Sequence, residues 1–253
     1  MNLHIHGTAG SAVVLIHGIP GSSRSWAAVA RALAPEHIVV VPDLLGFGDD
    51  GPWNELDAEA QATALAASLD RQGIGKATIV GHDFGGPIAM TLYASRPDLF
   101  ETFGLLATNA FPDTPIPFPL STVNWPIVGN GMARMLFSAP ALKMMLRMFG
   151  STELGNPESV RAIFTDALQN LEERYGHYPA ILREIRVPSL VLWGDRDPFF
   201  PVEQGRRLAD LLQDGDLEVI RGAGHFLPEQ RPDAVATCIA RLVARTSPVL
   251  RRS

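Results

Sequence analysis

Short apolar runs alternate with amphipathic segments along most of the chain. Runs rich in β-branched residues predict buried strands at 12–16, 37–42, 77–82, 103–108, 189–194 and 217–221. Apolar residues at helical spacing predict crossover helices near 23–34, 57–72, 86–96, 202–213 and 228–245. Residues 1–10 leave room for one further short strand. This alternation predicts an α/β fold with a mostly parallel sheet flanked by helices.

The segment 111–186 interrupts this alternation. It opens with four prolines between Phe111 and Pro119, which favours an extended hinge. A methionine-rich run and a helix predicted from about 157 to 175 follow. We therefore expect a core formed by 1–110 and 187–253, with residues 111–186 inserted as a helical cap.

Methionines in this insertion are candidates for lining a substrate pocket, because Met side chains fill irregular space and adapt to varied ligands. The alternative is that they pack the insertion onto the core. The residues concerned are Met135, Met144, Met145 and Met148.

Composition narrows the classes of protein to which this chain can belong. The chain has 253 residues, 46% of them hydrophobic, which suits one α/β domain with a large core. A net charge of −6 offers no basic surface for nucleic acid. The sequence has no signal-peptide pattern and no apolar stretch of about 18 residues. We expect a soluble cytoplasmic protein with no membrane partner.

The run Gly81-His82-Asp83-Phe84-Gly85-Gly86 carries the most chemical information. It connects a predicted strand to a predicted helix, which is the setting of a nucleophile elbow. Glycines two positions before and after Asp83 avoid a clash with the tight turn. A Ser at position 83 would indicate acyl transfer. Since a carboxylate is already anionic at neutral pH, Asp83 indicates attack on a saturated carbon and a covalent alkyl ester.

Further polar residues follow other predicted strands. Asp195 and Asp197 come after the strand at 189–194, and His225 comes after the last one. Nucleophile, acid and histidine therefore occur in the chain order that accompanies this elbow. His225 is the candidate base that activates water, and an aspartate fixes its tautomer.

An elbow nucleophile also needs two backbone N–H groups that stabilise an oxyanion. One comes from the residue after the nucleophile, here Phe84, and one from the loop after an earlier strand. The loop that begins at His17 and Gly18 places Ile19 in the second role.

These motifs together resemble the α/β-hydrolase fold family, in particular its aspartate-nucleophile branch of epoxide hydrolases and haloalkane dehalogenases. The resemblance spans nearly the whole chain. It rests on five motifs: His17-Gly18-Ile19-Pro20, Pro42-Asp43-Leu44-Leu45-Gly46-Phe47-Gly48, Gly81 to Gly86, Trp193-Gly194-Asp195-Arg196-Asp197 and Gly224-His225. It implies a cap over the active site and Asp197, rather than Asp195, as the acid. His82 then has a structural role.

The leaving group is the open question. Epoxide hydrolases use two cap tyrosines to protonate the epoxide oxygen, and here Tyr175 and Tyr178 are the candidates. Their closeness in sequence departs from the family pattern, and Trp125 stands near the early position. Haloalkane and haloacid dehalogenases use Trp, Asn or Arg donors where this chain has Phe84 and Ile19. The balance favours epoxide hydrolysis, with dehalogenation as the alternative.

Other classes of function stay open. One is a ligand receptor without catalysis on the same fold. Another is an esterase, which is disfavoured because carboxylate attack on an ester gives a mixed anhydride. We expect a small apolar organic substrate, water as co-substrate, and no metal or other cofactor. The methionine-rich cap is compatible with a homodimer.

Overall fold

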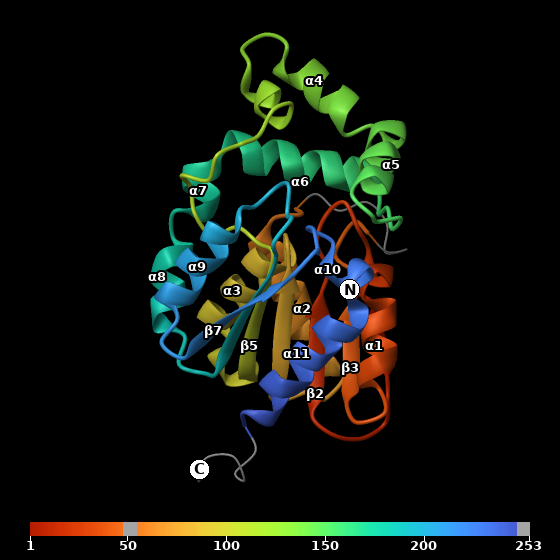
Figure 1. Cartoon of the computed structure of the whole chain (residues 1–253), viewed down its shortest axis with the longest axis vertical. Coiled ribbons are helices and arrows are strands. Elements are labelled where there is room, and N and C mark those ends of the chain that lie inside the picture. Colours follow the sequence, from red (N-terminus) through yellow and green to blue (C-terminus); the bar gives the residue numbers. More distant parts are fainter. Residues whose placement is uncertain (48–54, 247–253) are drawn as a thin grey trace.

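The computed structural model describes residues 1–47 and 55–246 (Figure 1). Gly48, the last residue of the motif that begins at Pro42, lies outside the described residues. A seven-stranded sheet runs through the molecule in the order β1-β3-β2-β4-β5-β6-β7. β1 is antiparallel to β3, and the other neighbouring pairs are parallel. The strands are β1 (Leu3–His6), β2 (Ala12–Ile16), β3 (Ile38–Pro42), β4 (Ala77–His82), β5 (Phe100–Leu106), β6 (Ser189–Gly194) and β7 (Gly215–Ile220).

The predicted mostly parallel sheet is confirmed, with shifts at the ends of β3, β5 and β7, of which the largest is in β5. β5 begins at Phe100 rather than at 103, directly after the short 3-10 turn Pro97–Leu99. It ends at Leu106 because Ala107 adopts φ 38°, which an extended strand does not allow. Thr108 therefore lies in a loop beyond the strand.

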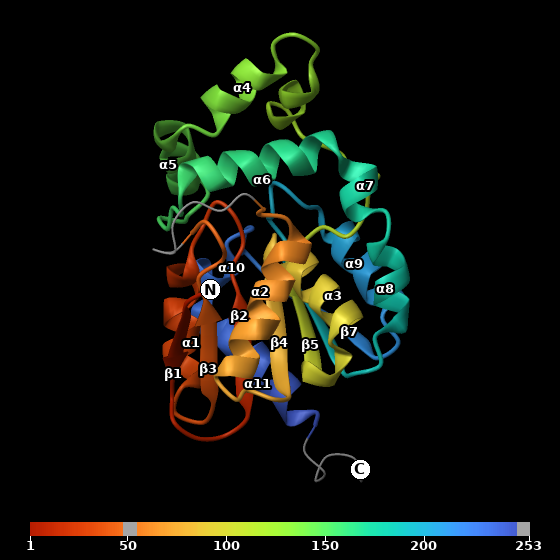
Figure 2. The ribbon, with the colours of Figure 1, turned by 180° about the vertical axis from the view of Figure 1, so that it is seen from behind.

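Alternate residues of each strand face two separate layers of helices. In β2, Val13 and Leu15 pack on the layer of α1 (Ala27–Leu33), α10 (Leu227–Gln230) and α11 (Pro232–Ala244). Val14 and Ile16 pack in the opposite core cluster. The helices of that cluster are α2 (Ala58–Arg71), α3 (Gly85–Ser95), α8 (Tyr178–Glu184) and α9 (Val202–Leu211). Figures 1 and 2 show these two faces from opposite sides.

The insertion between β5 and β6 is helical. After the 3-10 turn Leu120–Asn124 come α4 (Gly129–Leu136), α5 (Ala139–Met148), α6 (Pro157–Gln169) and α7 (Leu171–Tyr175). These elements lie above one end of the sheet, whereas α8 flanks the core (Figure 1). The cap has its own small core of Val123, Ala133, Phe137, Leu142 and Val160.

The prediction of one continuous helix at 157–175 is wrong. The helix is interrupted at Asn170. The side-chain amide of Asn170 donates to the carbonyl oxygen of Asp166 at 3.2 Å and to its carboxylate at 2.9 Å. Asn170 itself leaves the helical region, at φ −126° and ψ 40°, which ends α6. The break turns α7 and Tyr175 toward the core. None of the described helices is long and apolar enough to cross a membrane.

Candidate active site

Asp83 occupies a strained turn between β4 and α3. Its φ is 50°, in the left-handed region that few residues other than glycine enter. A Cβ on Gly81 would lie 2.2 Å from the carbonyl oxygen of Gly85, and a Cβ on Gly85 would lie 2.4 Å from that of Ile16. The tight approach expected from the glycine spacing is therefore present, and it lifts Asp83 out of the end of the sheet.

The backbone of the elbow is held from two sides. The N–H of Gly86 donates to the carbonyl oxygen of Asp83 at 2.9 Å. The hydroxyl of Thr108 donates to the same oxygen at 2.6 Å. Thr108 was missed by sequence reasoning, because it follows β5 and comes beside the elbow only through the pairing of β4 with β5.

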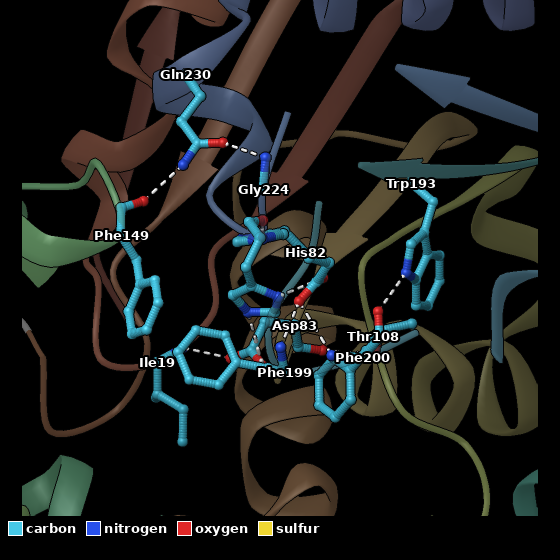
Figure 3. A network of polar contacts seen from close by, with 12 residues as sticks. Ile19, His82, Asp83, Thr108, Phe149, Trp193, Phe199, Phe200, Gly224 and Gln230 are labelled. Atoms are coloured by element: carbon cyan, nitrogen blue, oxygen red, sulfur yellow. Dashed lines mark hydrogen bonds and ion pairs between the residues drawn. The ribbon is translucent and has the colours of Figure 1, made fainter. Parts of the chain in front are cut away.

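The carboxylate of Asp83 lies at the backbone N–H groups of Ile19 and Phe84, which the sequence predicts as the oxyanion hole. Its Oδ2 accepts a hydrogen bond of 2.7 Å from the N–H of Ile19, and Oδ1 lies 3.5 Å from Nε2 of His225 (Figure 3). Burial raises the pKa of Asp83, but the hydrogen bond and charge of His225 and the backbone N–H of Phe84 outweigh it. The net pKa lies below the ordinary value, so this carboxylate is anionic at neutral pH.

Asp197 holds the other side of the histidine. Its Oδ2 lies 2.9 Å from Nδ1 of His225. Its Oδ1 accepts hydrogen bonds from the backbone N–H groups of Phe199 at 2.8 Å and Phe200 at 3.0 Å. Asp195 instead accepts from the N–H of Gly222 at 2.6 Å. The structure therefore places Asp197, and not Asp195, against His225.

His225 is buried between two carboxylates. Burial lowers its pKa, but the charge and hydrogen bond of Asp197, followed by those of Asp83, raise it to about 10. The imidazole is therefore a cation in the resting protein at neutral pH. The rings of Phe199 and Phe226 stand edge-on at 5.1 Å and exclude water from its sides.

The other two histidines of these motifs are neutral supports. Nε2 of His82 donates to the carbonyl oxygen of His225 at 2.9 Å. Nε2 of His17 accepts from the N–H of Leu44 at 3.3 Å. Burial lowers the pKa of each to about 4. The structural role expected for His82 agrees with this placement, and His17 is held in the same way.

Gln230 joins the histidine loop to the cap. Its Oε1 accepts from the N–H of Gly224 at 2.7 Å, and its Nε2 donates to the carbonyl oxygen of Phe149 at 2.6 Å (Figure 3). The ring of Phe149 lies 5.1 Å from that of Phe199, which in turn contacts His225. No sequence motif indicated Gln230, because Gly224 is six residues away but Phe149 lies 81 positions away in the chain.

A small apolar cavity of about 90 Å³ opens beside Asp83. Ile19 and Phe84 line it from the core, and Leu168, Leu171 and Tyr175 line it from the cap. Burial, with a contribution from the charge of Asp83, raises the pKa of Tyr175 above its ordinary value. Its hydroxyl has no hydrogen-bond partner among the described residues. Tyr175 thus presents a neutral hydroxyl beside Asp83.

A larger cavity of about 660 Å³ lies outside the first one. Phe84, Pro87, Ile163, Ala167 and Tyr175 line both cavities and so form the partition between them. Five acidic residues line the larger cavity, against Arg174 and His177: Glu55, Asp57, Glu59, Asp166 and Glu173. A substrate that passes through it meets a negative field.

Tyr178 is not part of the small cavity. Its side chain is buried, and its hydroxyl lies 3.2 Å from the hydroxyl of Thr91 in α3. Burial raises its pKa to about 12. Of the two candidate tyrosines, only Tyr175 stands beside Asp83, and Tyr178 anchors α8 to the core.

Trp125 and the four candidate methionines do not line the small cavity beside Asp83, which corrects the expectation for them. Trp125 is 54% exposed and lines a separate surface hollow with Ile127 and Asn130. Met135, Met144 and Met148 are exposed, and Met145 packs in the small core of the cap. Leu142 and Leu146 take the inward positions of α5, which leaves its methionines outside. Among residues 1–47 and 55–246, no His, Cys, Asp and Glu side chains group as metal ligands would.

Comparison with known proteins agrees with this arrangement. The sequence profile of the Alpha/beta hydrolase family matches residues 13–237. Lipase LipV of Mycobacterium tuberculosis is 31% identical over 263 residues, which cover 94% of this chain and 97% of that protein. An esterase from Thermogutta terrifontis superposes with a TM-score of 0.77 at 26% identity, over 97% of this chain and 93% of the esterase.

An ancestral haloalkane dehalogenase shares the fold, with a TM-score of 0.77 at 22% identity over 97% of this chain and 95% of the other. The family profile covers most of this chain, and the mostly parallel seven-stranded sheet agrees with it. We conclude that this protein is a member of the alpha/beta hydrolase family.

Proposed function

We propose that this protein is a hydrolase that works through Asp83 and a covalent alkyl ester, and that it opens epoxides to vicinal diols. One observation carries the proposal. The N–H of Ile19 already donates to Oδ2 of Asp83 itself. The oxyanion hole thus holds an oxygen of the nucleophile, which is where negative charge develops when water attacks an ester of Asp83.

The same observation argues against acyl transfer. In an esterase or lipase the oxyanion hole receives the carbonyl oxygen of the substrate. Here that position is filled by Asp83, and an attack by its Oδ1 on an ester would give a mixed anhydride. The names of Lipase LipV and of the Thermogutta terrifontis esterase describe those proteins. An Asp at the elbow favours a different first step for this chain.

In the first step, Oδ1 of Asp83 bonds to an epoxide carbon, and the bond from that carbon to the epoxide oxygen breaks. The oxygen takes a proton from the hydroxyl of Tyr175. A neutral phenol suits this role, and its raised pKa keeps it protonated. Among the residues that line the small cavity, Tyr175 is the one whose hydroxyl has no internal partner, since Asn109 and Thr114 bond to each other at 2.6 Å.

Formation of the ester also prepares the base. Asp83 loses its charge, so one of the two carboxylates that hold the pKa of His225 high is gone. His225 then gives its proton through solvent to the phenolate of Tyr175. The histidine becomes neutral at the step that needs a base.

In the second step, His225 takes a proton from water as the water oxygen bonds to the carboxyl carbon of Asp83. The N–H groups of Ile19 and Phe84 stabilise the oxyanion on Oδ2. Asp197 holds the imidazolium. The intermediate collapses with loss of the alkyl oxygen, which takes the remaining acidic proton as the diol leaves. Asp83 and His225 return to their initial charges.

Carbon–halogen cleavage by the same ester is the second candidate, but the cavity supports it less. No Trp or Arg is among the residues that line the small cavity. The indole N–H of Trp193 is already bonded to the carbonyl oxygen of Phe200 at 2.9 Å. The acidic lining of the outer cavity also disfavours haloacids, which are anions. These features favour an uncharged substrate.

The test is intact-mass spectrometry of the His225→Gln variant after separate incubations with small epoxides, alkyl halides and esters. We expect an adduct with the full mass of an epoxide, located at Asp83 by peptide mapping. An adduct that lacks the halogen would select dehalogenation instead.

The Asp83→Asn variant is the matched control and should stay unlabelled. Absence of any adduct, together with reversible binding of the same compounds to the wild type, would contradict the proposal and indicate a ligand receptor. An acyl adduct formed from an ester substrate would contradict it in favour of an esterase.

A further inference from the structure

The outer side of the cap exposes large apolar side chains. We call this set the cap face: Trp125, Ile127, Val128, Met135, Met144 and Met148. Exposed fractions range from 49% for Val128 to 103% for Ile127. Ile127 also has φ 71°, a conformation that is unfavourable for a β-branched residue. A concentration of exposed apolar side chains on a small part of a protein indicates a surface that binds something.

The charge of this part of the chain is opposite to that of the whole. Residues 114–152 contain no Asp or Glu, whereas the full chain has a net charge of −6. Arg134, Lys143 and Arg147 are all exposed here. On α5, Lys143 and Arg147 form one row at i, i+4 spacing, and Met144 and Met148 form the neighbouring row. Apolar and cationic groups are thus interleaved on one side of the helix.

A second copy of this chain is a poor partner for this surface. A two-fold contact through the cap face would bring Arg134, Lys143 and Arg147 near their own copies, and none of the three has an ion pair among the described residues. An anionic lipid surface satisfies both features, because its headgroups attract the cations while the apolar side chains enter the interface.

We propose that the cap face docks on bilayers that contain anionic phospholipid. Composition alone predicts no membrane partner, since the chain as a whole is acidic. The placement of Arg134, Lys143 and Arg147 leads to the inference of membrane docking, because these exposed cations attract anionic lipid locally. The rest of the molecule, being acidic, is repelled by the same lipids and so favours an orientation with the cap toward the membrane.

An exposed strap of the chain bounds part of the small cavity. Thr114, Ile116 and Leu120 line that cavity from one side of a short strap. Phe118, in the middle of the same strap, is 79% exposed. An apolar substrate dissolved in the bilayer would reach Asp83 past this strap. This last point rests on the proposed function, whereas docking itself does not.

The experiment is flotation of the full chain with vesicles of phosphatidylcholine alone or mixed with phosphatidylglycerol. We expect binding to the mixed vesicles and loss of binding at high salt. The Lys143→Gln/Arg147→Gln variant should bind about 30-fold more weakly, given roughly 1 kcal/mol for each cation near an anionic surface. The Met144→Gln/Met148→Gln variant should bind about tenfold more weakly or worse.

The matched control is Arg206→Gln/Val219→Ser, which removes one exposed cation and one exposed apolar side chain outside the cap. It should bind as the wild type does, as should Asp83→Asn, which separates docking from catalysis. Thermal melting of each variant verifies that it is folded. Failure of the wild type to bind mixed vesicles, or equal binding to neutral ones, would overturn the proposal. A dimer that the methionine substitutions dissociate would overturn it in favour of a second copy.

Discussion

Nε2 of His225 lies 3.5 Å from Oδ1 of Asp83, and the two side chains set each other's charge. Asp83 raises the pKa of the histidine, and the histidine lowers the pKa of Asp83. A buried ion pair of this kind stabilises the fold only in the pH range in which both groups are charged.

That pair predicts an alkaline loss of stability. The folded pKa of His225 is about 10, above the value near 6.5 in an unfolded chain. The folded state therefore binds the extra proton between these values. The contribution is fully present below about pH 6.5 and is lost as the pH rises through the folded pKa. The melting temperature of the wild type should fall from pH 7 to pH 10 more steeply than that of His225→Gln. Parallel curves would contradict the assignment.

Gly18→Ala should damage catalysis through the nucleophile. A Cβ at position 18 would lie 2.4 Å from Cβ of Asp83 and 2.6 Å from its Oδ2. The displaced carboxylate loses its place at the N–H of Ile19, and loss of such a donor typically lowers kcat by about 10²-fold or more. Gly131→Ala is the control, because nothing lies within 4 Å of its added methyl group. Steady-state kinetics on an epoxide that the wild type hydrolyses compares the two.

The two cap tyrosines should respond differently to loss of the hydroxyl. Tyr175→Phe should lower kcat for epoxide opening by about 10²-fold, because the leaving oxygen loses its acid. Tyr178→Phe should leave kcat nearly unchanged and cost about 1 kcal/mol of unfolding free energy, because it removes the contact with Thr91. Single-turnover kinetics and chemical denaturation measure the two quantities. Equal effects on kcat would remove Tyr175 from the mechanism.

Thr108→Val should weaken the elbow. It removes the 2.6 Å hydrogen bond to the carbonyl oxygen of Asp83 and should cost about 1 kcal/mol. For a chain of this size that lowers the melting temperature by about 2–4 °C. Thr108→Ser keeps the hydroxyl and should retain most of the stability. If the serine variant were as unstable as the valine variant, packing of the methyl group would account for the effect.

The sequence was sufficient to predict the sheet and the three side chains that meet at its edge, those of Asp83, Asp197 and His225. Carboxyl ends of parallel strands meet at one edge, so the residues that follow β4, β6 and β7 had to converge. The glycines around Asp83 marked the turn because their spacing has a steric cause. These are local signals that need no knowledge of which elements are neighbours.

Residues that act across elements left no such signal. Thr108 supports Asp83 from 25 positions away, and Gln230 reaches Phe149 from 81 positions away. The outward methionines of α5 were assigned inward because that helix is apolar on several sides, and the pattern does not say which side packs. Trp125 was misplaced for a similar reason, since its position depends on the path of the loop before α4.

The side-chain amide of Gln230 makes two hydrogen bonds at once, one to the backbone beside His225 and one to the end of α5. A molecule too large for the cavity of about 90 Å³ needs its lining, part of which comes from the cap, to move. Any displacement that carries Phe149 away takes one partner from the side chain that orients Gly224. Under the proposed function, the entry of bulky compounds and the alignment of His225 therefore depend on the same side chain, that of Gln230. Under the same proposal, the size of a substrate would then affect the rate of ester hydrolysis as well as entry into the cavity.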